Sequence, residues 1–219
     1  MLLPSGRHRY VHLADAVRLA LLWREGGIYL DTDIIVLRPL NELRNAVAEE
    51  KWEGSHRSLS NAVMAFEPHH PFLWACMEEF AAHFQPFGRA RSFPELLQLG
   101  LWGQNGPKLL DRVLKRYDNG TRADGSQQGR GVRVLQTNSF YQVPPNDILR
   151  HYRKGQGQQL VEDLHKSGAF GLHLWNQVTR GFHPEYGSAV ETLLRRSAPS
   201  SCVPSPGQGS DPGACVPKL

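Results

Sequence analysis

GGIYLDTDIIVL, residues 26–37, has the composition of a buried β-strand and nevertheless carries two carboxylates. Its isoleucine, tyrosine and valine residues favour a strand, and Pro39 ends the pattern. Because side chains alternate along a strand, we expect Asp31 and Asp33 on the same face, about 6.6 Å apart. Apolar surroundings make two carboxylates costly unless hydrogen bonds or a cation compensate. The stretch therefore allows two interpretations: a strand end that reaches water, or a site where oxygen ligands bind Mg²⁺ or Mn²⁺.

A helix is expected directly before this stretch. Residues 11–25, VHLADAVRLALLWRE, place Leu13, Val17 and Leu21 at helical spacing, so we expect these side chains to form its apolar face, which Leu22 and Trp23 widen. Gly26 and Gly27 then end the helix. A helix that runs directly into a buried strand indicates an α/β fold with parallel strands.

The rest of the chain alternates strands with helices up to residue 197. Strands are expected at 58–66 and 169–177, one or two strands at 132–143, and helices at 71–84, 107–117 and 187–196.

Three regions are expected: an irregular N-terminus at 1–10, one α/β domain at 11–197, and a disordered tail at 198–219. The tail is rich in Pro, Gly and Ser and has almost nothing to bury. A nucleotide-binding α/β domain normally begins with a strand–helix unit ahead of its acidic strand. Nothing before Val11 has that pattern, so we expect the domain to lack this unit.

Charge and hydropathy argue against two classes of partner. The formal net charge is only +4, and no cluster of Lys and Arg is interleaved with aromatic residues, so we expect no nucleic acid partner. No stretch reaches the roughly 18 apolar residues that a membrane span requires, so we expect no such span in this chain.

One polar pair lies on the helix before the acidic strand. Asp15 and Arg18 are three residues apart and share a helix face. They form either a surface ion pair worth a few tenths of a kcal/mol or a polar pair at a cleft that holds ligand hydroxyl groups. The pattern alone favours the first.

Further candidates lie downstream. In GLHLWN, His173 and Trp175 share a strand face. They are either core residues or, respectively, a nitrogen ligand to the same cation and an indole N–H donor to a phosphate. Asn61, Gln104 and Asn105 are either ordinary loop amides or partners for sugar hydroxyl groups.

Four blocks in order resemble one enzyme family. AD-x-x-R-x-x-L-L-W-x-x-GGIYLDTD resembles the core of glycosyltransferase family 32. SLSNAVMAFEPHHPF, WGQNGPKLLDRV and FGLHLWNQ resemble its α-1,4-glycosyltransferase branch. That branch includes α-1,4-galactosyltransferases similar to globotriaosylceramide synthase and α-1,4-N-acetylglucosaminyltransferases. The resemblance covers residues 10–195 and implies a GT-A fold, a Rossmann-like α/β domain that binds a nucleotide sugar.

The resemblance also implies a cofactor and its ligands. The donor is usually a UDP-sugar and the cation Mn²⁺, with Mg²⁺ as the alternative. Asp33 matches the direct metal ligand, and Asp31 matches the residue that contacts the ribose or the donor sugar and reaches the metal through water. His173 matches the C-terminal position near the metal and the diphosphate.

Donor contacts are implied in the same way. Asp15 and Arg18 match the pair that holds the donor sugar, and Trp175 lies beside His173. Asn61 is the further candidate for the donor site.

The implied function is a retaining glycosyltransferase that moves galactose or N-acetylglucosamine to a glycan or glycolipid acceptor through an α-1,4 linkage. The resemblance implies the Golgi lumen as its location. The acceptor hydroxyl is expected to attack from the leaving-group face, with Gln104 or Asn105 lining the opposite face. Two alternatives remain: an inactive sugar- or protein-binding remnant, and a phosphohydrolase of the haloacid dehalogenase type. The second lacks its expected downstream acidic pair.

Overall fold

The computed structural model describes residues 9–50, 58–84, 103–119, 131–155 and 158–197. The chain forms two compact units. The N-terminal unit holds the residues up to 32 and 40–137, and the C-terminal unit holds 33–39 and the residues from 138 onward. The domain expected at 11–197 thus consists of two units, and its action as one catalytic domain stays a prediction. Residues 1–8 and the tail at 198–219 lie outside the described residues.

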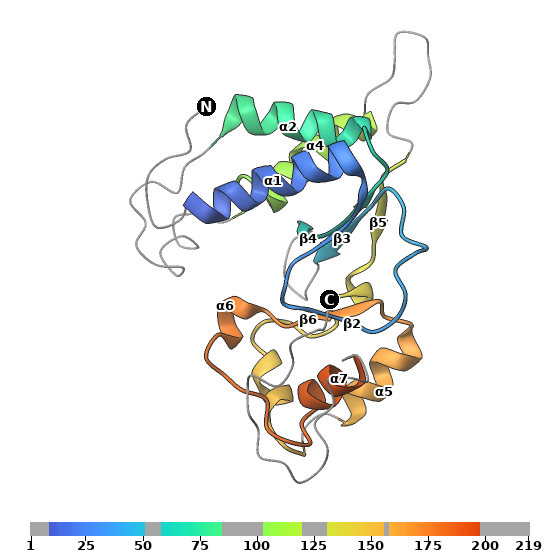
Figure 1. The fold of residues 1–219 in the computed structure, drawn as a ribbon, viewed down its shortest axis with the longest axis vertical. Helices are drawn as coiled ribbons and strands as arrows, with labels where there is room; N and C mark the ends of the chain where they lie inside the picture. Colours follow the sequence, from blue (N-terminus) through green and yellow to red (C-terminus); the bar gives the residue numbers. More distant parts are fainter. Residues whose placement is uncertain (1–8, 51–57, 85–102, 120–130, 156–157, 198–219) are drawn as a thin grey trace, which may run out of the picture. The chain divides into compact units, whose positions relative to one another are not determined.

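In its described residues, the N-terminal unit is a four-stranded sheet with three helices. Its strands, in the order β1-β4-β3-β5, are β1 (Gly27–Leu30), β4 (Ser58–Phe66), β3 (Ala46–Glu50) and β5 (Arg133–Leu135). The helices are α1 (Arg9–Glu25), α2 (Pro71–His83) and α4 (Pro107–Asn119), which lie side by side in Figure 1. Val47, Met64 and Phe72 are fully buried between these elements. This packing fixes the end of β1, where Asp31 follows.

The C-terminal unit is built on a two-stranded ladder. Its elements are β2 (Ile34–Val36), η1 (Thr137–Ser139, which begins at the unit boundary), η2 (Ile148–Tyr152), α5 (Gln158–Ser167), β6 (Gly171–His173), α6 (Asn176–Thr179) and α7 (Ala189–Ser197). The core is apolar, with Ile148, Leu172 and Val190 fully buried. The short strand β6 ends at His173, which places that side chain at the end of the ladder.

The acidic stretch differs from its prediction. A single strand was expected through residue 37, but the chain turns at residues 32 and 33 and forms two strands in different sheets. β1 pairs with β4, whereas β2 pairs with β6. Asp31 therefore precedes the turn and Asp33 lies within it, so the two do not share one strand face. The composition indicated a strand correctly but contained no signal for the change of partner.

The prediction of parallel strands is wrong for most of the described pairings. β4 runs antiparallel to β1 and β3, and β2 runs antiparallel to β6. The pair β3 and β5 is parallel. The mixed α/β architecture is nevertheless consistent with the expected GT-A fold. None of the helices in the described ranges is both long and apolar enough to cross a membrane.

The buried face of α1 agrees only in part with its hydrophobic spacing: of the expected apolar residues, Leu22 is buried and Trp23 is half-buried, but the other three are exposed. Leu13, Val17 and Leu21 are 41–46% exposed. The buried side chains of the helix are mainly polar: His12, Asp15, Arg18, Leu19 and Leu22. Tertiary hydrogen bonds explain the difference, because they satisfy the polar groups that the helix turns toward the sheet.

Candidate nucleotide-sugar site

Asp31 lies directly after β1, and two side chains fix its carboxylate. Its backbone N–H donates to the Ala62 carbonyl at 2.9 Å and so continues the pairing with β4. Asp31 Oδ1 accepts hydrogen bonds from Arg18 Nη1 at 3.2 Å and from Tyr29 Oη at 2.7 Å. The Asp31 side chain is 32% exposed, so a ligand can reach it. The N-terminal unit thus presents one oriented carboxylate at the end of a strand.

Arg18 is the centre of the contacts behind Asp31. Its side chain is 8% exposed. Nη1 donates to the Asn61 carbonyl at 2.6 Å, and the guanidinium lies 4.5 Å from the centre of the Tyr29 ring. These contacts hold the guanidinium against Asp31, so in this structure Arg18 acts through that carboxylate. Its direct contact with a donor sugar stays a prediction.

Asp15 is buried next to Arg18 and Asn61. Asp15 Oδ1 accepts from Asn61 Nδ2 at 2.8 Å and lies 3.7 Å from Arg18 Nη2. Burial raises the pKa of Asp15 to about 6, although the Arg18 charge and the Asn61 hydrogen bond oppose this rise. Gly106 closes the other side, where any Cβ would collide with the Asn61 amide. The three predicted residues Asp15, Arg18 and Asn61 therefore form one polar cluster.

The amide pair at the start of α4 divides into two environments. Asn105 is 1% exposed, and its Nδ2 lies 3.0 Å from His12 Nδ1. Gln104 is half-buried, and its backbone carbonyl accepts from Arg112 Nη2 at 3.2 Å. The predicted place of both residues opposite a leaving group stays a prediction. Asn105 is the less accessible of the two.

Asp33 and His173 lie together in the C-terminal unit. Asp33 Oδ2 accepts the backbone N–H of Asn176 at 2.8 Å, and Asp33 Oδ1 lies 3.6 Å from His173 Nε2. β6 positions the imidazole, because His173 is paired with Ile34 in the ladder. The side chains are 19% and 10% exposed for Asp33 and His173, respectively. An oxygen and a nitrogen donor thus face each other at the ends of β2 and β6.

Trp175 controls the orientation of His173. The Trp175 backbone N–H donates to His173 Nδ1 at 3.1 Å, so the neutral ring carries its proton on Nε2, which faces Asp33. Trp175 has φ 54° and ψ 59°, a left-handed conformation that is uncommon outside glycine. Its indole Nε1 donates to the Val143 carbonyl at 2.8 Å. The indole N–H that we expected beside a phosphate is therefore engaged within its own unit.

The structure adds residues that sequence reasoning missed. Tyr29 holds Asp31, and its place two residues earlier on the same strand face was a usable signal. Tyr152 lies near Asp33 and forms a hydrogen bond with Thr179. Burial raises the pKa of Tyr152, a hydrogen bond with Thr179 lowers it, and the Asp33 charge raises it further. No sequence spacing connects Tyr152 with Asp33, because 119 positions separate them (152 − 33).

Two family models match this chain. A model described as "Alpha 1,4-glycosyltransferase conserved region" matches residues 65–203. A second, "Glycosyltransferase sugar-binding region containing DXD motif", matches residues 5–51. The second span includes Asp31 and Asp33, and the first includes His173 and Trp175. Asn61 lies between the two spans.

Known proteins match over most of the chain. Lactosylceramide 4-alpha-galactosyltransferase of Rattus norvegicus is 35% identical over 173 residues, which are 79% of this chain and 43% of the relative. The human protein of that name is 34% identical over 77% of this chain and 42% of the relative. Human alpha-1,4-N-acetylglucosaminyltransferase is 32% identical over 89% of this chain and 52% of the relative. The chain thus spans about half the length of these relatives.

Proposed function

Because this chain belongs to the α-1,4-glycosyltransferase family, we propose that it is a metal-dependent retaining glycosyltransferase with a UDP-sugar donor. The acceptor is a glycan or a glycolipid, and the transferred sugar is galactose or N-acetylglucosamine in an α-1,4 linkage. The relatives' names support this range of sugars and linkage. The Golgi lumen as location rests on the family resemblance. One observation carries the proposal: the Asp33 carboxylate faces the His173 imidazole at 3.6 Å. Asp31, two residues before Asp33 in the sequence, is held in place by Arg18.

The donor atoms suit a divalent cation. Asp33 Oδ1 and His173 Nε2 are 3.6 Å apart. Two ligands on opposite sides of a Mg²⁺-sized ion are about 4.2 Å apart, so these two atoms are close enough to contact the same cation. A carboxylate with an imidazole favours Mn²⁺, whereas Mg²⁺ prefers oxygen ligands throughout. Asp31 is two residues from Asp33, so their Cα atoms lie within about 7 Å in any chain conformation. Asp33 would bind the cation directly, and Asp31 would add an oxygen through water. His173 would join them as a ligand once its ring gives up the hydrogen bond from the Trp175 backbone N–H, so that an unprotonated ring nitrogen faces Asp33.

The cation supplies charge stabilisation for the diphosphate leaving group. The chain's own residues orient the donor. Arg18 and Tyr29 fix Asp31 as a hydrogen-bond acceptor for a ribose or sugar hydroxyl group. The buried cluster of Asp15 and Asn61 supports that arrangement from behind. We propose Asp15 and Arg18 as the pair that contacts the donor sugar, with Asn61 as a further contact.

Retention follows from an α-linked donor and an α-linked product. We favour attack by the acceptor hydroxyl group on the same face as the leaving group, because the sequence offers no obvious carboxylate nucleophile outside the acidic pair. Gln104 is the better candidate for the opposite face. Asn105 is buried and already pairs with His12.

A donor-hydrolysis assay tests this function. The full chain is incubated with UDP-galactose, UDP-N-acetylglucosamine or UDP-glucose, with and without Mn²⁺, and released UDP is measured. We expect release to require Mn²⁺ and to fall by at least 10²-fold in Asp33→Asn, because the variant loses a charged ligand. Hydrolysis of a phosphomonoester without UDP release would contradict the proposal. Sugar binding without turnover would identify an inactive remnant.

A further inference from the structure

A second concave region lies in the C-terminal unit, between the segment 142–147, η2 and α5. Its cavity measures about 470 Å³, within the range of about 300–1,000 Å³ typical of small-molecule sites. Val143 and Leu160 form an apolar part of its wall. This cavity is large enough for one or two sugar rings and includes neither Asp33 nor His173.

Apart from the apolar residues, which include Pro144, the wall consists of planar polar side chains, namely Gln142, Asp147, Arg150, His151, Gln159 and Asp163. The charged groups among them are the carboxylates of Asp147 and Asp163 and the guanidinium of Arg150. Arg150 Nη2 lies 3.2 Å from Asp147 Oδ2, and Gln159 Nε2 donates to Asp163 Oδ1 at 2.8 Å. Two carboxylates against one guanidinium disfavour a phosphate or another anion. Amide, carboxylate and guanidinium groups around an apolar floor suit a neutral ligand with many hydroxyl groups.

This cavity shares a wall segment with the residues around His173. Val143, which lines the cavity, accepts the Trp175 indole hydrogen bond at 2.8 Å. The Tyr141 ring lies 5.1 Å from the His173 ring and 5.5 Å from the Trp175 ring. Residues 141–143 thus contact His173 and Trp175 through the Tyr141 ring and the Val143 carbonyl, and they line the cavity through Gln142 and Val143.

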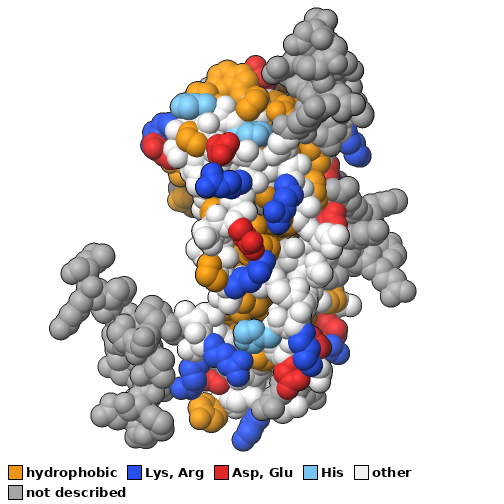
Figure 2. Space-filling model, turned by 90° about the vertical axis from the view of Figure 1, so that its right-hand side faces the viewer, with side chains coloured by type: hydrophobic (Ala, Val, Ile, Leu, Met, Phe, Trp, Pro, Cys, Tyr) orange, Lys and Arg blue, Asp and Glu red, His pale blue; other side chains and the backbone are white. Residues whose placement is uncertain are grey.

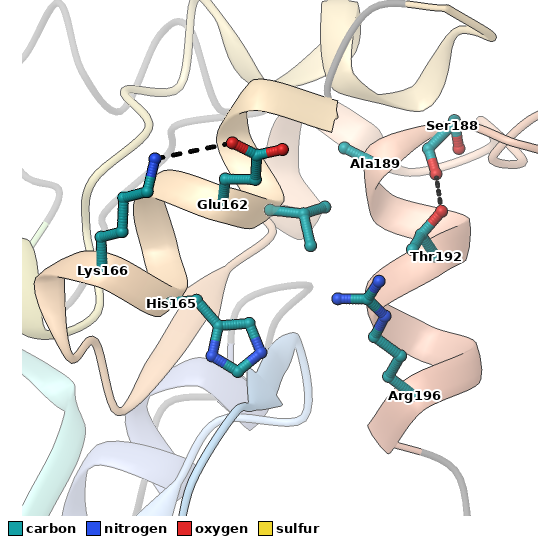
Figure 3. Close-up of a pocket in the computed structure, with 8 residues that line it drawn as sticks. Glu162, His165, Lys166, Ser188, Ala189, Thr192 and Arg196 are labelled. Carbon is teal, nitrogen blue, oxygen red and sulfur yellow. Dashed lines mark hydrogen bonds and ion pairs between the residues drawn. The ribbon is translucent and has the colours of Figure 1, made fainter.

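The other side of α5 has a different chemistry. A cavity of about 320 Å³ between α5 and α7 is lined by His165, Lys166 and Arg196 (Figure 3). Lys166 pairs there with Glu162 at 3.6 Å. Figure 2 shows acidic and basic side chains next to one another at the bottom of the view. The excess of basic groups makes the cavity between α5 and α7 less suited to a neutral sugar. Glu162 lines this cavity and provides a matched control on the same helix.

We propose that the cavity between segment 142–147, η2 and α5 binds a neutral sugar ring of the acceptor. Gln159 and Asp163 are its hydroxyl-binding residues. The inference rests on the proposed glycosyltransferase function and names the acceptor site for it. Donor binding at Asp31 and Asp33 does not use this cavity, so substitutions here change acceptor recognition and leave donor hydrolysis as it is.

Ligand-observed NMR tests the inference directly. Methyl β-lactoside and methyl β-N-acetylglucosaminide are titrated separately to 50 mM against the full chain and the variants Gln159→Ala, Asp163→Ala and Glu162→Ala. We expect at least one sugar to bind, and Gln159→Ala and Asp163→Ala each to weaken it about fivefold or more, the effect of about one lost hydrogen bond. Glu162→Ala should leave the dissociation constant unchanged. All three residues are exposed, so the substitutions should leave the fold intact, and circular dichroism is used to check that each variant is folded.

The outcomes separate this inference from the proposed function. The acceptor site would be overturned if neither sugar binds, or if all variants bind the sugars as tightly as the parent chain does. If binding responds as expected but UDP-sugars are not hydrolysed, the cavity stands as a sugar site and the transferase function fails. If hydrolysis is intact and Glu162→Ala weakens sugar binding instead, the site lies on the other side of α5 and the inference is wrong.

Discussion

Replacing Arg18 with methionine should destabilise the N-terminal unit strongly. The guanidinium donates to Asp31 Oδ1 at 3.2 Å and to the Asn61 carbonyl at 2.6 Å. It also lies 3.7 Å from the buried Asp15 carboxylate. Methionine keeps the volume of the aliphatic stem but leaves Asp15 without its cation. Breaking a buried ion pair on one side costs about 3–5 kcal/mol, so we expect a loss of that size in the free energy of unfolding at pH 8.

Lower pH should reduce this loss. The Arg18 charge lowers the pKa of Asp15, so its removal raises a pKa that burial already places at about 6. In the variant, Asp15 therefore takes up a proton at pH 5 and sheds most of the penalty. Denaturant unfolding at pH 5 and pH 8 measures both values. Arg24→Met, at an exposed ion pair on the same helix, is the control and should change stability by less than about 0.5 kcal/mol. A loss below 1 kcal/mol for Arg18→Met at pH 8, or one that does not depend on pH, would refute the reasoning.

Three further predictions concern single side chains. The folded-state pKa of Asp15 is raised from 3.8 to about 6, so ionisation opposes folding. The stability of the wild type relative to Asp15→Asn should then fall by up to about 3 kcal/mol as pH rises from 4 to 7; unfolding curves at several pH values that give a constant difference would contradict this. Glu79 is 3% exposed and binds Arg112 Nε at 2.7 Å and Arg116 Nη2 at 2.6 Å. Glu79→Ala should cost about 2–3 kcal/mol in urea unfolding, whereas the exposed Glu78→Ala should cost little. Trp175→Phe removes the indole donor to the Val143 carbonyl and should lower stability by about 1 kcal/mol in the same measurement; an unchanged midpoint would show that this hydrogen bond contributes nothing.

Local signals in the sequence predicted several elements well. The strand expected at 58–66 is β4 with the same bounds, and the helix expected from Pro71 is α2. Gly26 ends α1 as expected, with φ 67°, and a Cβ there would collide with Pro68. Each of these features depends on residues that are close in sequence, where proline geometry and glycine conformation decide the outcome.

Tertiary choices were harder to predict. The spacing of Leu13, Val17 and Leu21 described a helix correctly but gave the wrong buried face, because hydrogen bonds from Asn61 and Asn105 decide which side of α1 turns inward. Hydropathy alone contains no information about such partners.

The candidate site shows the same limit. Sequence reasoning identified Asp33 and His173 as partners, and the structure places them 3.6 Å apart within one unit. It did not predict that Trp175 would bind His173 through its backbone N–H and Val143 through its indole. Those contacts depend on a left-handed backbone conformation that a tryptophan rarely adopts.

The outward side of α1 offers a handle for protein engineering. Leu13, Val17 and Leu21 present aliphatic surface to the solvent on the face opposite Asp15 and Arg18. Such surface promotes self-association at high concentration. Replacing the three residues with Lys, Glu or Gln keeps helix propensity and leaves every described hydrogen bond of the polar cluster in place. The resulting variant should remain monodisperse at higher concentration and yield better samples for crystallisation, with the same catalytic constants as the parent chain.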